Sequence, residues 1–291
     1  MEIKTAIQKC LDDLSLADRT RLAYRMGLNS FLAYLETQDI KETDDASKLT
    51  VDHFVYHLPY LSRKYSKGSA GVYASAAKAL LDWLVIAKMI YPDYNDTLRI
   101  KMAMNRSHRR REDKLPRFPN KTDVPRMMET VRLYEEKSPI KERNIALIEF
   151  LASTGCRNNE IIQLNVGDLD MVNRTAVVTG KGSKERRIWF SQSAADAIRE
   201  YWRVRGFAMS ADPVFCSHDK GSSGRETKRI TTTTTRRVVK QIAILAGIDP
   251  HKFSPHYFRH AFAIRVLSET GNLALVQDLL GHKDPGATRV Y

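Results

Sequence analysis

Four side chains in the last 36 residues have the types and the spacing that chemistry on a phosphate needs. His256 and Arg259 lie three residues apart, so they share one face of a helix. His282 directly follows a glycine, and Tyr291 comes nine residues later. A guanidinium and two imidazoles can grip a phosphate, and a phenol can attack it. These four residues are therefore candidates for a phosphoryl-transfer site.

The local pattern predicts that helix ends carry these side chains. A hydroxyl followed by proline, Ser254-Pro255, predicts a helix start, and Gly271 predicts its end. A second short helix is predicted over residues 273–280, with Gly281 as its last neighbour. Asp284-Pro285 predicts one more helix start before the tyrosine. The candidate groups would thus sit on successive helix edges.

Three further candidates lie earlier in the chain. Arg157 stands just past a predicted helix over residues 140–153, and Glu160 follows three residues later. Lys181 occupies the turn of a predicted β-hairpin over residues 175–190. Taken singly, each candidate has an ordinary explanation as a helix cap, a turn lysine, a core histidine or a packed aromatic. Their joint order along the chain favours a functional interpretation.

Composition narrows the class of partner. The 291 residues carry a net charge of +13 and have a pI near 9.6, which favours a polyanion. Cys10, Cys156 and Cys216 are odd in number and have no paired spacing, so we expect a reducing cytoplasm and no disulfide. We find no signal peptide and no apolar run long enough to cross a bilayer, and we expect no membrane partner.

Other chemistries fit the motifs poorly. The glycines around Lys181 lack the spacing of a nucleotide-binding loop. His256 and His260 lie four apart, as in a helical zinc site, but Tyr257 stands where a zinc protease needs glutamate. No GxSxG nucleophile motif is present. We therefore expect no metal site and no cofactor.

The chain divides into two predicted domains. Residues 1–105 have helical periodicity, including a long helix from Ser15. Residues 106–119 are rich in arginine and interrupted by proline, which predicts a basic linker, and residues 120–291 form the second domain. The apolar stripe expected on the long helix comprises Leu22, Met26, Leu28, Phe31, Leu32 and Leu35.

Basic side chains outside the chemical motifs are candidates for contacts with nucleic-acid phosphates. On the first domain a solvated helix face explains them equally well, whereas for the linker we favour phosphate contact. The candidates are Arg19, Arg21, Arg25, Arg109, Arg110, Arg111, Lys184, Arg236 and Arg237.

The motifs together resemble those of the phage integrase family of tyrosine recombinases. Residues 154–160, Thr-Gly-Cys-Arg-Asn-Asn-Glu, are similar to its first conserved box, although Asn159 stands where serine is common. Residues 254–260, Ser-Pro-His-Tyr-Phe-Arg-His, are similar to its second box. The hairpin lysine, the Gly-His pair at 281–282 and Tyr291 complete the resemblance, which covers essentially the whole chain.

The resemblance implies a fold and a set of roles. The fold is mainly α, with a helical-bundle (SAM-like) core-binding domain over residues 1–105. An α+β catalytic domain with a small antiparallel sheet follows over residues 120–291. Six positions match the family's catalytic residues, and Glu160 is expected to orient one of them. These six are Arg157, Lys181, His256, Arg259, His282 and Tyr291.

The implied activity is site-specific cleavage and rejoining of DNA through a 3′-phosphotyrosyl intermediate, without metal or ATP. Double-stranded DNA with specific sites and a homotetramer on paired sites are the implied partners, in the cytoplasm at the nucleoid. A type IB topoisomerase-like enzyme and a DNA-binding protein that does not cut remain alternatives. The resemblance is to the simple Xer-like type, without an arm-binding domain.

The sequence ends at Tyr291, where the resemblance implies a continuing segment that docks on a neighbouring protomer. We therefore expect this chain to be truncated, to bind one site as a monomer and to recombine poorly.

Overall fold

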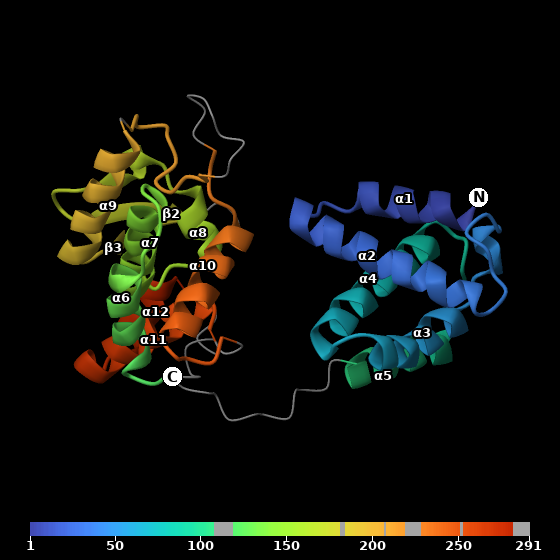
Figure 1. The fold of residues 1–291 in the computed structure, drawn as a ribbon. Helices are drawn as coiled ribbons and strands as arrows, with labels where there is room; N and C mark the ends of the chain where they lie inside the picture. The colour runs from blue at the N-terminus through green and yellow to red at the C-terminus, as the bar shows by residue number, and fades with distance from the viewer. Residues whose placement is uncertain (108–118, 181–183, 207, 219–227, 251–252, 282–291) are drawn as a thin grey trace. The chain divides into compact units, whose positions relative to one another are not determined.

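A computed structural model describes residues 1–107, 119–180, 184–206, 208–218, 228–250 and 253–281. The chain separates into two compact units, Met1–Lys114 and Leu115–Tyr291, which are described one at a time (Figure 1).

Helices build the first unit, as its periodicity predicts. The last of them ends at Ser107, two residues inside the linker that we expected from residue 106. The elements are α1 (Ile3–Asp13), α2 (Asp18–Glu36), the 3₁₀ turn η1 (Ala46–Lys48), α3 (Val51–Lys64), α4 (Lys67–Ile86) and α5 (Tyr94–Ser107).

Close contact between α2 and α4 organises the core of this unit. A Cβ on Gly27 of α2 would lie 2.9 Å from the Cα of Tyr73 on α4, so only glycine allows this approach. Phe31 of α2 is fully buried in the same core. The expected stripe on α2 is wrong at Leu22 and Met26, which are 60% and 53% exposed. At about 100° per residue, these two positions lie roughly 180° and 140° around the helix from Phe31.

The same core explains an apolar helix that the sequence analysis did not single out. Among the described residues, α4 is long and apolar enough to span a bilayer by length and composition, with a mean hydropathy of 1.2. By that measure the expectation of no such run is wrong. Soluble core helices pass the same test, and α4 packs against α2 and α3 with Leu80 and Leu84 fully buried.

The second unit is a helical assembly with a small antiparallel sheet in the order β1-β2-β3, in agreement with the predicted fold class. Its elements are α6 (Asp123–Leu133), α7 (Ile140–Thr154), α8 (Asn158–Gln163), η2 (Val166–Asp168), β1 (Leu169–Asp170), β2 (Thr175–Thr179), β3 (Glu185–Trp189), α9 (Gln192–Arg205), α10 (Thr232–Leu245), α11 (Pro255–Thr270) and α12 (Leu273–Leu280). The elements η2 and β1 follow one another directly and lead into the β-hairpin.

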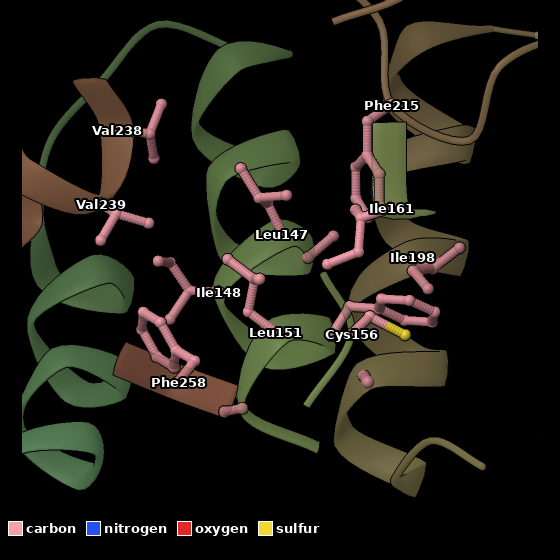
Figure 2. Close-up of a cluster of buried hydrophobic side chains, with 14 of the residues drawn as sticks. Leu147, Ile148, Leu151, Cys156, Ile161, Ile198, Phe215, Val238, Val239 and Phe258 are labelled. Carbon is pink, nitrogen blue, oxygen red and sulfur yellow. The ribbon is translucent and has the colours of Figure 1, made fainter. Parts of the chain in front are cut away.

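Helix α7 is the centre of the second unit. It packs against α9, α6 and α11, so almost every face of it is covered. Leu147 and Leu151 of α7 lie among side chains from other helices, including Ile198 of α9 and Phe258 of α11 (Figure 2). The carboxyl end of α7 is therefore held rigidly, and the chain leaves it at Gly155.

We predict that His57 makes the stability of the protein sensitive to acid. His57 on α3 is fully buried beside the rings of Phe31 and Tyr34. Burial lowers the pKa of His57 from 6.5 to about 4, against an opposing contact with the backbone of Ser30. The unfolded chain therefore binds a proton that the folded chain excludes, and stability falls as the pH drops from about 6.5 to about 4. The loss approaches about 3 kcal/mol.

Urea unfolding of the full chain at pH 7 and pH 4.5 measures this effect. His57→Phe should flatten the pH dependence, since it removes the titrating group and keeps an apolar ring. The same pH dependence in both proteins would show that His57 is not responsible.

Candidate active site

The end of α7 and the start of α8 place the first pair of candidates. Gly155 ends α7 in the left-handed conformation, with φ 60°, and Arg157 is the N-cap of α8. The backbone N–H of Arg157 donates to Glu160 Oε2 at 2.8 Å, and its Nη1 donates to Oε1 at 2.9 Å. Glu160 is 3% exposed and Arg157 is 41% exposed at the side chain. The carboxylate thus lies beneath the guanidinium and leaves it accessible from solvent.

Helix α11 places the second pair. Ser254 and Pro255 begin this helix and Gly271 ends it, as predicted. Arg259 is 1% exposed, and its Nη1 donates to the carbonyl of Gly155 at 3.0 Å. His256 lies one turn earlier on α11, and its ring meets that of His260 edge-on, with centroids 4.5 Å apart.

A tight contact fixes α11 against the end of α7. A Cβ on Gly155 would come within 2.7 Å of the ring of Phe262, which lies three residues beyond Arg259 on α11. Glycine is therefore needed at position 155 for two reasons: the backbone has a positive φ, and a side chain would collide with this ring. The contact sets the distance between Arg259 and the loop that carries Arg157.

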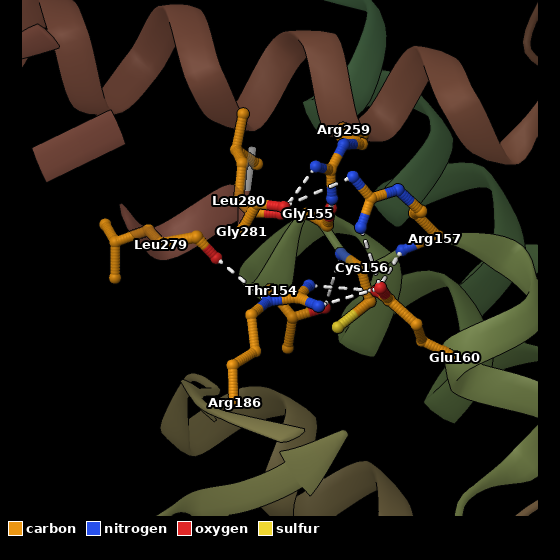
Figure 3. A network of polar contacts seen from close by, with 10 residues as sticks. All are labelled: Thr154, Gly155, Cys156, Arg157, Glu160, Arg186, Arg259, Leu279, Leu280 and Gly281. Carbon is orange, nitrogen blue, oxygen red and sulfur yellow. Dashed lines mark hydrogen bonds and ion pairs between the residues drawn. The ribbon is translucent and has the colours of Figure 1, made fainter. Parts of the chain in front are cut away.

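The carboxyl end of α12 is held by three guanidiniums from three different elements (Figure 3). Arg186 Nε donates to the carbonyl of Leu279 at 3.4 Å, Arg259 Nη2 donates to that of Leu280 at 2.6 Å, and Arg157 Nη2 donates to that of Gly281 at 3.5 Å. The last carbonyls of a helix lack partners within the helix and carry its negative dipole end. In α12 the three arginine side chains donate the missing hydrogen bonds to these carbonyls.

Arg186 is a site residue that the sequence analysis missed. Its Nη1 and Nη2 donate to the two carboxylate oxygens of Glu160, at 2.7 and 2.9 Å. The two-residue period of a β-strand could have identified Arg186 from the sequence. Arg186 shares the inward face of β3 with Ile188, whereas Arg187 between them is exposed. An inward-facing arginine needs a buried acceptor, and Glu160 supplies it.

The charges in this cluster do not balance. Glu160 is the one carboxylate paired with these guanidiniums in the described part of the chain, and Arg259 contacts only carbonyl oxygens. Burial, and then Arg157, lower the pKa of Arg259 to about 10, so it keeps its charge at neutral pH. Burial raises the pKa of Glu160, but hydrogen bonds from Arg186 and Arg157 outweigh it and the pKa is lowered.

The histidines on α11 respond to the same positive charge. Burial, followed by Arg259 and Arg157, lowers the pKa of His256 below its ordinary 6.5. Burial, followed by His256 and Arg259, lowers that of His260 to about 4. Both imidazoles are therefore neutral at pH 7, and a neutral imidazole can accept a proton.

The structure brings together Arg157, Glu160, His256 and Arg259 from the predicted set. Twelve candidates remain to be placed, and six of them lie outside the described residues. Those outside are Lys181, His282, Tyr291, Arg109, Arg110 and Arg111. The described residues contain no group of three or more His, Cys, Asp or Glu side chains that could hold a metal ion.

The remaining basic candidates lie mostly on the surfaces of the two units. Lys184, Arg236 and Arg237 are exposed on the second unit, and Arg19 and Arg25 are exposed on the first. Arg21 is half-buried and lies 3.7 Å from Asp12, so a carboxylate partly neutralises it.

Comparisons with known proteins agree with this fold. Residues 118–291 match the phage integrase family, and residues 9–88 match the phage integrase N-terminal SAM-like domain. The chain is 30% identical to the tyrosine recombinase XerD of Haemophilus ducreyi, over 98% of this chain and 91% of that protein. It is 27% identical to the tyrosine recombinase XerC of Roseiflexus sp., over 100% of this chain and 88% of that protein. The chain therefore belongs to the phage integrase family of tyrosine recombinases.

Solved structures share the fold. The site-specific recombinase XerH bound to its difH substrate superposes with a TM-score of 0.68 at 22% identity, over 93% of this chain and 76% of that one. A lambda integrase dimer bound to a COC′ core site superposes with a TM-score of 0.67 at 12% identity, over 99% and 97% of the two chains.

We predict that Glu160→Gln destabilises the second unit strongly. Removing the carboxylate leaves Arg186, 15% exposed, and Arg157 without their counter-charge, which costs roughly 3 kcal/mol. Chemical unfolding of the full chain measures the loss. Glu185→Gln is the matched control, because Glu185 is exposed on β3 and should change stability by less than about 0.5 kcal/mol. Equal effects of the two substitutions would contradict a structural charge cluster at Glu160.

Proposed function

We propose that this protein is a site-specific DNA recombinase that cuts and rejoins DNA through a covalent 3′-phosphotyrosyl link. The observation that carries the proposal is the unbalanced guanidinium cluster around one buried carboxylate. A phosphodiester supplies the missing negative charge, and paired N–H donors match its non-bridging oxygens. The tyrosine recombinases XerD and XerC, to which the chain is similar over nearly its full length, support the proposal.

Each candidate has a chemical task in this reaction. Arg157 and Arg259 hold the non-bridging oxygens and stabilise the charge that grows at phosphorus. The phenol of Tyr291 attacks phosphorus and passes its proton to the neutral imidazole of His256. The bond from phosphorus to the 5′ oxygen breaks, and Lys181 protonates that oxygen. His282 donates a further hydrogen bond to the phosphate. The phosphotyrosyl bond keeps the energy for rejoining, so the reaction needs no ATP.

Glu160 supports this chemistry without touching the DNA. Its carboxylate contacts the guanidinium and the backbone N–H of Arg157, and it lies 3% exposed beneath that side chain. It therefore orients Arg157 and prevents the arginine from turning away from the phosphate.

DNA binding is proposed for both units, with residues 1–105 as the core-binding domain, 106–119 as a basic linker and 120–291 as the catalytic domain. The exposed arginines Arg19 and Arg25 of the first unit and Arg236 and Arg237 of the second support it. The net charge of +13 suits a partner that binds by displacing counterions. A tetramer on paired sites, and action at the nucleoid, complete the proposal.

Tyr291→Phe should abolish covalent attachment and leave DNA affinity within about twofold, because the ring remains and only the nucleophile is lost. DNA sites selected from a random pool by binding provide the substrate, nicked so that cleavage traps the intermediate. Adducts are counted on denaturing gels. Tyr94→Phe, which changes an exposed tyrosine of the first unit, should form adducts like the unaltered protein. An adduct that persists in Tyr291→Phe, or no adduct in any variant, would reject the proposed nucleophile.

Lys181→Ala should block cleavage of ordinary DNA and spare a substrate whose bridging 5′ oxygen is sulfur. A thiolate leaves without a proton, so the general acid becomes dispensable for that substrate. Single-turnover rates on the two substrates measure the difference. If both substrates fail equally, Lys181 is not the general acid.

A further inference from the structure

We propose that Arg186 is a positioning residue of the active site, which orients Arg157 through Glu160 and sets the end of α12. The inference rests on the proposed function, since it assigns a role within that reaction. Arg186 lies on β3 and would not itself touch DNA phosphate.

The first support is the geometry of its contact with Glu160. Two parallel bonds, 2.7 and 2.9 Å long, join the guanidinium fork to both carboxylate oxygens. A paired contact of this kind fixes the plane of the carboxylate as well as its position. The same two oxygens receive the side chain and the backbone N–H of Arg157. The plane that Arg186 sets is therefore the plane on which Arg157 is oriented.

The second support is the contact with α12. Arg186 Nε donates to the carbonyl of Leu279 at 3.4 Å. A Cβ on Gly281 would lie 2.8 Å from Arg186 Cδ, so the arginine stem lies directly against the residue that ends α12. Gly281 has a φ of 64° and immediately precedes His282. Arg186 thus contacts the end of α12, which directly precedes a proposed catalytic residue in the sequence.

The third support is its burial and its anchorage. The side chain of Arg186 is 15% exposed, and its strand position is fixed by pairing with Val178 on β2. Burial works to lower the pKa of Arg186, but its hydrogen bonds to Glu160 outweigh it and the pKa is raised, so the guanidinium stays charged. One rigid side chain therefore joins β3, α8 and α12, three elements far apart in the sequence.

A purely structural ion pair predicts different behaviour. In that case any cation of similar length would suffice, and cleavage would follow stability alone. A lysine keeps the charge, but all its N–H donors lie on one nitrogen. It therefore cannot contact both carboxylate oxygens in parallel and the Leu279 carbonyl at the same time. Arg186→Lys therefore separates positioning from charge.

The main experiment compares Arg186→Lys with Arg187→Lys on the full chain. Arg187 is the next residue on β3, and its side chain is exposed on the other face of the strand. We expect Arg186→Lys to slow single-turnover cleavage of nicked DNA about 10- to 100-fold, with DNA affinity unchanged within about threefold. Arg187→Lys should cleave at the unaltered rate. Thermal unfolding of each variant confirms that rates are compared on folded protein. Equal rates for the two variants would overturn the proposal.

Two further measurements test the route of the effect. Glu160→Gln combined with Arg186→Lys should cleave no more slowly than the worse single variant, because the pair acts as one unit. Multiplying defects would overturn the assignment to Glu160. A bridging 5′ sulfur should not restore Arg186→Lys, since Arg157 acts on the non-bridging oxygens. Full restoration would place the effect on leaving-group protonation and overturn the proposal.

Failure of this inference is distinguishable from failure of the proposed function. Adduct formation by the unaltered protein tests the function. The ratio of rates between the Arg186 and Arg187 variants tests the positioning role.

Discussion

The second unit depends on one electrostatic constraint, a buried carboxylate surrounded by more positive charge than it can neutralise. Glu160 pairs with Arg157 and Arg186, while Arg259 stands close by with carbonyl oxygens as its acceptors. Breaking such a buried pair is costly, so the elements that carry these residues must keep their arrangement. Those elements are the end of α7, the start of α8, strand β3 and helix α11. The rigid packing of α7 supplies the frame that holds them.

The same group of arginines also holds the end of α12. Its last carbonyls need donors. Arg157 and Arg259, which are proposed to bind phosphate, supply two of them, and Arg186 supplies the third. A guanidinium carries more N–H donors than the two that Arg259 engages here, so it can hold α12 and still meet a phosphate oxygen. The position of α12 is therefore coupled to the arginines of the site. The guanidiniums that form the candidate active site also make the hydrogen bonds that hold α12 in place.

Local chemistry explains which features could be predicted from sequence. The glycines at 155, 271 and 281 all have positive φ and end helices, and at 271 and 281 the sequence pattern predicts that end. The face of α2 was partly wrong because Leu22 and Met26 extend the apolar pattern beyond the face that α4 covers. Arg186 escaped prediction because its partner lies 26 residues away and its role depends on how β3 packs against α8. Periodicity shows that a side chain points inward, but only the tertiary fold shows what it meets.

The excess charge also has a cost for the folded protein, and that cost favours anion binding. A guanidinium as deeply buried as that of Arg259 loses hydration and is repelled by Arg157, and the nearby carboxylate of Glu160 offsets this only in part, so its pKa falls to about 10. A bound phosphodiester would supply the missing negative charge. Part of its binding free energy would then come from relieving the electrostatic cost of burying these guanidiniums in the free protein. Anything that binds the folded state alone also stabilises it. DNA that enters this site should therefore tighten α11, α12 and the Glu160 cluster together, because all three share the same guanidiniums.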